Sequence, residues 1–226
     1  MSNFNLYLHN NNNMFKKLLI SFLLLTAMLS ANAQTLSKAI FWLGPDRNII
    51  RKIKVKLDEM TFTIENYAIV MPKEIDGDVR YYNKFDGADK AGKLKSIGSR
   101  SFNYYNQFDG EDKAGKLKSI NNIVINYYNK FDGEELKGKL KSIGNLTISY
   151  YNRFDGQEKE GKIKSVGDIP VNYYNRFDGE HQSAKVKTVG PVTITYFSRF
   201  DDPDHIGKIK SLKGNSEQVT VKASVL

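Results

Sequence analysis

The stretch Tyr150-Tyr151-Asn152-Arg153-Phe154-Asp155-Gly156 decides how this chain is built. Near-identical copies of it precede and follow at a fixed shift of 23 residues, and the last copy is decayed. Most copies are followed by an acidic and polar stretch and then by Gly-Lys-Leu/Ile-Lys-Ser-Ile/Val. A fixed period in this range indicates a tandem repeat architecture. The sequence therefore predicts six repeats over residues 81–213. The copies begin at Tyr81, Tyr104, Tyr127, Tyr150, Tyr173 and Tyr196.

Within a copy the side chains alternate with a period of two. One face of residues 146–155 carries Leu146, Ile148, Tyr150, Asn152 and Phe154, and the other face carries more polar residues. Alternating β-branched and aromatic residues predict a half-buried strand. The following Asp-Gly is turn chemistry, and a second, shorter strand is expected over 162–166. The predicted fold is therefore all-β: an elongated array of antiparallel β-hairpins, an open meander with two strands per repeat.

The two ends of the array need covering, because one 23-residue unit buries too little apolar surface to be stable by itself. Residues 34–80 contain irregular β-like runs without the motif, and we predict that they form an N-terminal cap. Residues 214–226 alternate apolar and polar side chains from Val219 onward, which predicts a capping strand.

The N-terminus has the order of a secretory signal peptide. Lys16 and Lys17 precede an apolar run over 18–29, and Ala31-x-Ala33 is a small-residue cleavage site. We predict a signal peptide over 1–33 with its true start at Met14. The apolar run is shorter than the roughly 20 residues of a membrane span. The mature chain is therefore expected to be exported to the periplasm or the outside of the cell, and not to span a membrane.

Composition limits the chemistry that the chain can perform. The 226 residues include 34 Lys and Arg against 25 Asp and Glu, a net charge of +9, with no Cys and three His. Thiolate metal sites, disulfides and Cys nucleophiles are excluded. An active site is normally one asymmetric constellation, which near-identical copies do not provide. We predict no enzymatic activity, no cofactor and no metal site, and we do not expect nucleic acid as a partner of an exported chain.

The spacing Tyr-x-x-x-Phe, with a glycine seven residues after the Phe as in Tyr81, Phe85 and Gly92, resembles MORN repeats. The copies depart from that family by having Asn where MORN units have Gly after the Tyr (Asn83), and Leu or Ile at the second glycine of Gly-x-Gly (Leu94). The array also resembles exported bacterial proteins built from Tyr-Tyr-Asn-Arg-Phe-Asp-Gly units. Both resemblances imply an elongated β meander used for binding or scaffolding, with no catalytic residues to carry over.

The second tyrosine of each copy is the first candidate for a binding role. It shares its predicted strand face with the residue two positions on, which is often Lys or Arg. An aromatic ring beside a cation, repeated along a sheet, predicts a stacking platform for sugars or planar groups. The alternative, which we favour, is cross-strand packing that stabilises the sheet. The candidate residues are Tyr82, Tyr105, Tyr128, Tyr151 and Tyr174 with Lys130, Arg153 and Arg176.

Two charged columns also recur. Lysines at the positions of Lys93 and Lys95 would form a basic stripe able to attract a polyanion, or would be solvated residues that discourage edge-to-edge pairing. Carboxylates at the positions of Asp86 and Asp89 could hold calcium, although the known 12-residue loop spacing is absent and Asp-Gly turn chemistry explains the first of them.

The sequence thus predicts a non-enzymatic exported repeat protein that provides an extended binding or structural surface at the cell envelope. The expected partner is an envelope polysaccharide, a lipopolysaccharide or another envelope protein. Two alternatives are a carbohydrate- or lipopolysaccharide-binding module that uses the Tyr and Lys/Arg columns, and a self-assembling, curli-like fibrous protein.

Overall fold

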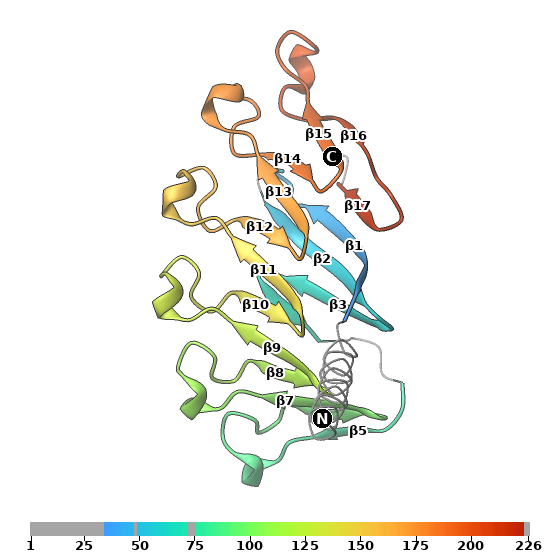
Figure 1. Ribbon diagram of the computed structural model, residues 1–226, viewed down its shortest axis with the longest axis vertical. Coiled ribbons are helices and arrows are strands. Elements are labelled where there is room, and N and C mark those ends of the chain that lie inside the picture. The colour runs from blue at the N-terminus through green and yellow to red at the C-terminus, as the bar shows by residue number, and fades with distance from the viewer. Residues whose placement is uncertain (1–33, 48, 72–75, 224–226) are drawn as a thin grey trace, which may run out of the picture. The chain divides into compact units, whose positions relative to one another are not determined.

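The computed structural model describes residues 34–47, 49–71 and 76–223 (Figure 1). The predicted signal peptide lies outside these residues. Thr35–Leu226 forms one compact unit, and its described part contains strands and short 3₁₀ turns but no α-helix.

The largest element is a sheet of 12 strands in which every strand pairs with its neighbours in sequence. All of its pairs are antiparallel. The predicted all-β meander of consecutive hairpins is therefore confirmed. The strands are β5 (Val79–Tyr81), β6 (Leu94–Ile97), β7 (Arg100–Tyr104), β8 (Leu117–Ile120), β9 (Ile123–Tyr127), β10 (Leu140–Ile143), β11 (Leu146–Tyr150), β12 (Ile163–Val166), β13 (Ile169–Tyr173), β14 (Val186–Val189), β15 (Val192–Tyr196) and β16 (Ile209–Lys213).

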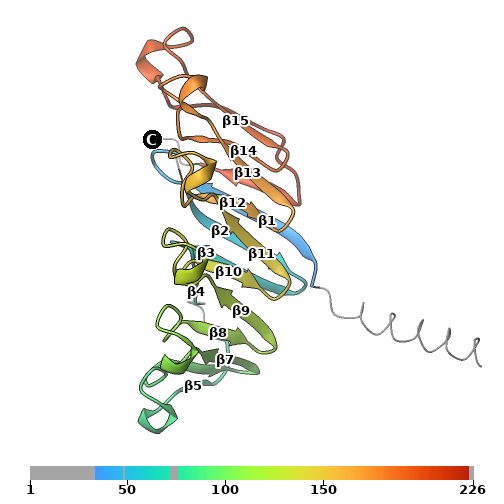
Figure 2. The same ribbon diagram turned by 60° about the vertical axis from the view of Figure 1, so that its left-hand side comes forward.

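Two kinds of connection alternate along this sheet. Tight two-residue turns join one copy to the next, and their first residue has a positive φ, for example 54° at Gly144 and 52° at Asn121. Only Gly and a few residues such as Asn adopt this conformation readily. Longer loops carry the 3₁₀ turns and lie along one edge of the sheet (Figure 2). The 3₁₀ turns are η1 (Lys84–Asp86), η2 (Gln107–Asp109), η3 (Lys130–Asp132), η4 (Arg153–Asp155), η5 (Arg176–Asp178) and η6 (Pro203–His205).

A β-bulge recurs where each longer loop meets the sheet. Between β7 and β8, Asn103 faces Ser119 and Tyr104 faces Leu117, so Lys118 is the extra residue. The same shift occurs beside β5, β9, β11, β13 and β15. A bulge redirects the side chain of the extra residue, and here that residue is always the second lysine of the Lys-x-Lys stretch.

A second sheet of five strands lies against one face of the array, with the order β17-β1-β2-β3-β4 (Figures 1 and 2). Both segments that the sequence assigned to caps supply its strands. β1 pairs with β17 in parallel, which joins the two ends of the described chain within one sheet. The strands are β1 (Leu36–Leu43), β2 (Ile50–Leu57), β3 (Met60–Glu65), β4 (Ala68–Val70) and β17 (Val219–Lys222).

The core lies between the two sheets. One cluster of buried residues includes Phe41 and Val55 from the second sheet and Ile125, Ile148 and Ile194 from the array, all at most 1% exposed. Backbone hydrogen bonds also cross between the sheets, from the Leu140 N–H to the Tyr67 carbonyl and from the Val186 N–H to the Arg47 carbonyl. The second sheet thus buries the apolar face that the alternation predicted for Leu146, Ile148 and Tyr150.

The predicted strand over 146–155 is wrong beyond residue 150. β11 ends at Tyr150, and Arg153–Asp155 forms the 3₁₀ turn η4. Asn152 is the N-cap of this turn: its side chain accepts the Phe154 N–H at 2.8 Å, and the Asp155 carboxylate accepts the Asn152 N–H at 2.9 Å. This capping box satisfies backbone donors that a continuing strand would have paired. Phe154, expected on the inner face, is therefore carried out to solvent.

Candidate functional site

The second tyrosines, predicted as candidate ligand contacts, lie in the packing between neighbouring copies. Tyr105, Tyr151 and Tyr174 are at most 8% exposed, and Tyr82 and Tyr128 are half-buried. Each hydroxyl donates to a backbone carbonyl 20 residues later in the chain, as Tyr151 does to Val171 at 2.9 Å. Burial raises the pKa of Tyr105, Tyr151 and Tyr174. These contacts have the character of cross-strand packing.

Each of these rings also contacts the first tyrosine of the next copy edge-on. The centroids of Tyr151 and Tyr173 are 5.9 Å apart with an interplanar angle of 78°, and the other copies repeat this geometry. Edge-to-face pairs are the favoured geometry of aromatic packing. The Tyr pairs thus connect each copy to the next.

The first lysine of each of the first five copies is likewise used in packing. Lys139 Nζ donates to the Gly161 carbonyl at 2.6 Å and lies over the Tyr150 ring. The equivalent lysines make the same bond to the next copy. Partial desolvation lowers the pKa of Lys139. These lysines are cationic links between copies, and their ammonium groups do not form an open stripe.

The second lysine, redirected by the bulge, pairs with the aspartate of its own loop. The Nζ–Oδ1 distances are 2.9–3.4 Å in the first five copies, and Lys210 pairs with Asp201 in the last. The same lysine lies over the second tyrosine, as Lys164 does over Tyr151 at 5.2 Å. The hydrogen bond from the Asn152 N–H, with help from Lys164, lowers the pKa of Asp155. The loop aspartates, considered above as calcium ligands, are thus engaged in caps and ion pairs.

Lys130, Arg153 and Arg176, predicted to accompany the second tyrosines, are exposed and accompany phenylalanines instead. The Arg153 guanidinium lies 4.8 Å from the Phe154 ring centroid, and Arg176 lies 4.9 Å from that of Phe177. Lys84, Lys130 and Arg199 lie similarly over the adjacent Phe.

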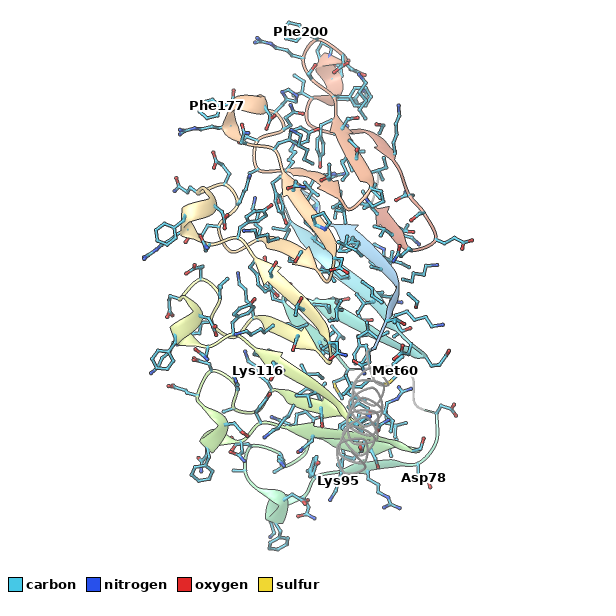
Figure 3. All side chains as sticks on the ribbon, in the orientation of Figure 1. Met60, Asp78, Lys95, Lys116, Phe177 and Phe200 are labelled. Carbon is cyan, nitrogen blue, oxygen red and sulfur yellow. The ribbon has the colours of Figure 1, made fainter. Side chains whose placement is uncertain are left out.

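These phenylalanines are the most exposed large apolar side chains of the described protein. Each is 83–88% exposed at the tip of its loop, and Phe177 and Phe200 point away from the ribbon in Figure 3. We call this set the Phe row: Phe85, Phe108, Phe131, Phe154, Phe177 and Phe200. Sequence reasoning missed it because the alternation was extended past Tyr150. The Asn-x-x-Asp capping pattern beside the first five Phe residues was the available signal.

The tips that carry the Phe row are firmly held. In the first five copies an Asn–Asp capping box closes the 3₁₀ turn. A glycine with φ between 106° and 124° follows it. Two neighbouring tips enclose a slot of about 330 Å³ between Gly156, Gln157 and Glu158 on one side and Asn175, Arg176 and Phe177 on the other.

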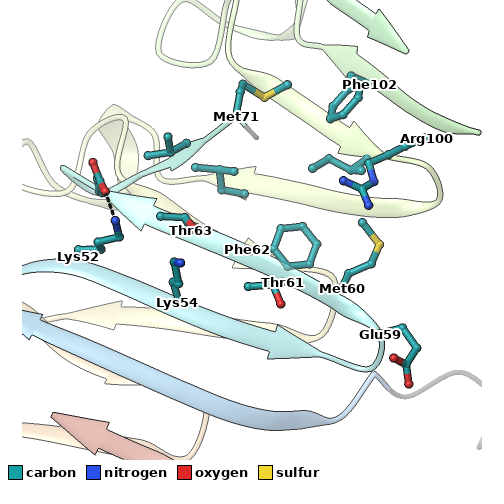
Figure 4. Close-up of a pocket in the computed structure, with 14 residues that line it drawn as sticks. Lys52, Lys54, Glu59, Met60, Thr61, Phe62, Thr63, Met71, Arg100 and Phe102 are labelled. Atoms are coloured by element: carbon teal, nitrogen blue, oxygen red, sulfur yellow. Dashed lines mark ion pairs between the residues drawn. The ribbon is translucent and has the colours of Figure 1, made fainter. Parts of the chain in front are cut away.

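A separate groove of about 390 Å³ lies between β3, β4 and the array (Figure 4). Met60, Phe62 and Met71 from the second sheet and Phe102 from β7 line it. At its border Lys52 and Glu65 form an ion pair at 3.0 Å. Its lining combines apolar side chains with charged ones such as Lys54, Glu59 and Arg100, and we assign no chemistry to it.

Among residues 34–47, 49–71 and 76–223, no group of three or more His, Cys, Asp or Glu side chains is placed to hold a metal ion. The same residues include no helix long and apolar enough to cross a membrane. Comparison with known proteins found no matching family model, no curated relative and no similar solved structure.

Proposed function

We propose that this chain is a non-enzymatic exported protein whose Phe row is an extended binding surface at the cell envelope, with the six motif copies as MORN-like structural units. The observation that carries the proposal is the repeated exposure of phenylalanine, 83–88% in every copy. Scattered exposed apolar residues are ordinary on a protein surface. A periodic row of rings on rigid tips is different, because each ring forgoes burial that is worth about 1.5–3 kcal/mol.

The Phe row fits a binding role better than the columns that the sequence suggested. The second tyrosines and both lysine columns make bonds within the array, and a ligand would have to displace those bonds. The Phe rings stand in water, five of the six beside a Lys or Arg side chain, and the capped turns hold them in place before any partner arrives. Preorganised side chains lose little conformational entropy on binding.

Binding to envelope material tests this proposal directly. The full chain and a variant with Phe131, Phe154, Phe177 and Phe200 changed to Ser would be incubated with the envelope fraction of the producing organism and sedimented. We expect the variant to bind at least about tenfold more weakly, because each aromatic contact contributes about 0.5–1.5 kcal/mol.

The matched control is Val124→Ser, an apolar residue that is 49% exposed away from the tips. It should sediment like the unchanged chain. Circular dichroism of the Phe variant should match the unchanged chain, since the four rings contribute little to the core. Equal sedimentation of the folded Phe variant and the unchanged chain would refute the role of the Phe row.

A further inference from the structure

The slot between the tips of η4 and η5 has the composition of a sugar-binding subsite. In the slot between η4 and η5, Phe177 provides an exposed ring, Arg176 provides a guanidinium, and Glu158 and Gln157 provide a carboxylate and an amide. A pyranose presents an apolar C–H face and a rim of hydroxyls that both donate and accept. The Phe177 ring can stack on the C–H face, and the mixed donors and acceptors of Arg176, Glu158 and Gln157 can form hydrogen bonds with the hydroxyls. We propose that this slot and the equivalent positions beside Phe154 and Phe200 bind every second residue of a linear, neutral polysaccharide.

The spacing of the slots supports a polymeric ligand. Two strands separate one tip from the next, which corresponds to a step of about 9–10 Å. This is close to the length of two pyranose units in an extended β-1,4-linked chain. A regular polymer would therefore meet an equivalent ring and guanidinium at each slot. Once one slot holds the polymer, the other slots meet it at a high effective concentration. Several weak subsites on one ligand therefore give a higher overall affinity.

The slots are not equivalent along the chain, and the differences favour the C-terminal ones. In the N-terminal copies Asp89 and Asp112 accept the backbone N–H of Gln107 and Lys130 from the next tip, at 2.8 and 2.9 Å, which fixes those carboxylates. Glu158 has a longer side chain and instead folds over Gly156, where its Oε2 lies 3.3 Å from the position of an added Cβ. The Glu158 carboxylate therefore lines the slot.

The residue that precedes the Phe also differs between the N-terminal and the C-terminal copies. Lys84, Gln107 and Lys130 precede the first three rings, whereas arginine precedes the last three. A planar guanidinium holds two hydroxyl oxygens in a fixed geometry, which an ammonium does not. The C-terminal slots therefore combine arginine with an acid or amide from the preceding tip.

The charges in the slot favour a neutral glycan over a polyanion or a membrane. The slot contains one carboxylate, Glu158, and one guanidinium, Arg176, so it offers no excess of positive charge to an acidic polysaccharide or an anionic headgroup. Insertion of the tips into lipid would also desolvate the carboxylate and amide beside each ring, which is unfavourable without partners. A sugar hydroxyl supplies such partners.

Calorimetry with defined oligosaccharides tests this inference, which rests on the proposed binding role of the Phe row. The probes are β-1,4-linked hexamers of glucose and of N-acetylglucosamine, with hexagalacturonate as the acidic arm and phosphatidylglycerol vesicles as the lipid arm. We expect at least one neutral hexamer to bind the full chain, and Phe154→Ala with Phe177→Ala to weaken that binding at least about tenfold. The matched control, Phe85→Ala with Phe108→Ala, should change it less than about twofold.

Each contrary outcome overturns the inference in a recognisable way. Failure of both neutral hexamers to bind, or binding of only hexagalacturonate or vesicles, excludes a neutral glycan. Equal loss in the two double variants excludes the C-terminal preference. If envelope sedimentation depends on the Phe row while neutral hexamers do not bind, the glycan assignment fails and the proposed function stands. If sedimentation is independent of the row, the proposed function itself fails.

Discussion

At the scale of single residues, the tyrosine pair explains why the motif repeats so strictly. From the second copy onward the first tyrosine belongs to the core, where Tyr127, Tyr150 and Tyr173 are at most 5% exposed. The second tyrosine connects its copy to the next through an edge-on ring contact and a hydroxyl bond to a backbone carbonyl. A substitution at either position therefore affects two copies.

Removing one of these hydroxyls tests this role. Tyr151→Phe leaves the ring in place and deprives the Val171 carbonyl of a donor at 2.9 Å. We expect the free energy of unfolding to fall by about 1–2 kcal/mol, the effect of losing one hydrogen bond to a buried group. Urea unfolding followed by circular dichroism measures it. Phe154→Ala, a larger truncation at an exposed site, should stay within about 0.5 kcal/mol of the unchanged chain. A larger effect of Phe154→Ala than of Tyr151→Phe would contradict this assignment.

Sequence reasoning placed the first tyrosine of each copy correctly on a strand, but it could not determine which of the two tyrosines were accessible. Alternation places Tyr150 inward, and the structure agrees. Tyr151 follows the last residue of β11, where the chain turns toward η4, so its burial depends on the neighbouring copy and not on the face of a strand. The accessible ring, Phe154, was predicted to be inside for the same reason: the end of the strand was misplaced.

At the scale of the element, the loop tip depends on one backbone conformation that only glycine adopts easily. Gly110 has φ 107° and ψ 141° at the C-cap of η2, and a Cβ added there would meet nothing within 4 Å. The cost of Gly110→Ala is therefore conformational and not steric. We expect a loss of about 1–3 kcal/mol in the free energy of unfolding, measured by urea titration. The exposed neighbour Glu111→Ala is the control and should change stability by less than about 0.5 kcal/mol. Indistinguishable curves for the two variants would show that the tip relaxes at no cost.

The same tips predict sensitivity to acid. Backbone hydrogen bonds, followed by the paired lysines, hold the pKa of Asp109, Asp132, Asp155 and Asp178 below the ordinary value. A carboxyl group whose pKa is lowered by folding stabilises the folded state above its unfolded pKa, near 3.9, and loses that effect as the pH falls through the folded value. The melting temperature should therefore fall progressively below about pH 4.

The triple variant Asp109→Asn, Asp132→Asn and Asp155→Asn provides the comparison. It should melt at a lower temperature than the unchanged chain at pH 7, and its melting temperature should depend less steeply on pH in the acid range. An unchanged acid slope in the triple variant would mean that other carboxylates control the transition.

At the scale of the whole molecule, the second sheet could not be predicted from the repeats. Its closing contact pairs β1 with β17, so that Ala39 faces Val219 across nearly the full length of the chain. Both segments showed β-like alternation, which predicts strands, but alternation contains no information about which strand is the partner. The 23-residue period likewise predicts only which strands are neighbours within the array. A cover that lies along the face of the array leaves no periodic mark in the sequence.

This cover protects the middle of the array more than its two end strands. An array held together only by contacts between neighbours would fray similarly from both ends. Here Tyr81 in β5 is 59% exposed and Val79 is only half-buried, whereas Val186, Val189 and Ile194 in β14 and β15 are fully buried. The backbone carbonyl of Arg47, between β1 and β2 of the second sheet, also accepts the Val186 N–H at 2.9 Å. No residue of the other end strand, β16, is buried. We therefore expect backbone amides of β5, β6 and β16 to exchange with deuterium fastest among the array strands, and those of β10 to β15 to be the best protected, since exchange follows local opening. Hydrogen–deuterium exchange with mass spectrometry resolves these segments. Equal protection of β5–β6 and β14–β15 would mean that the second sheet adds nothing to the stability of the strands it covers.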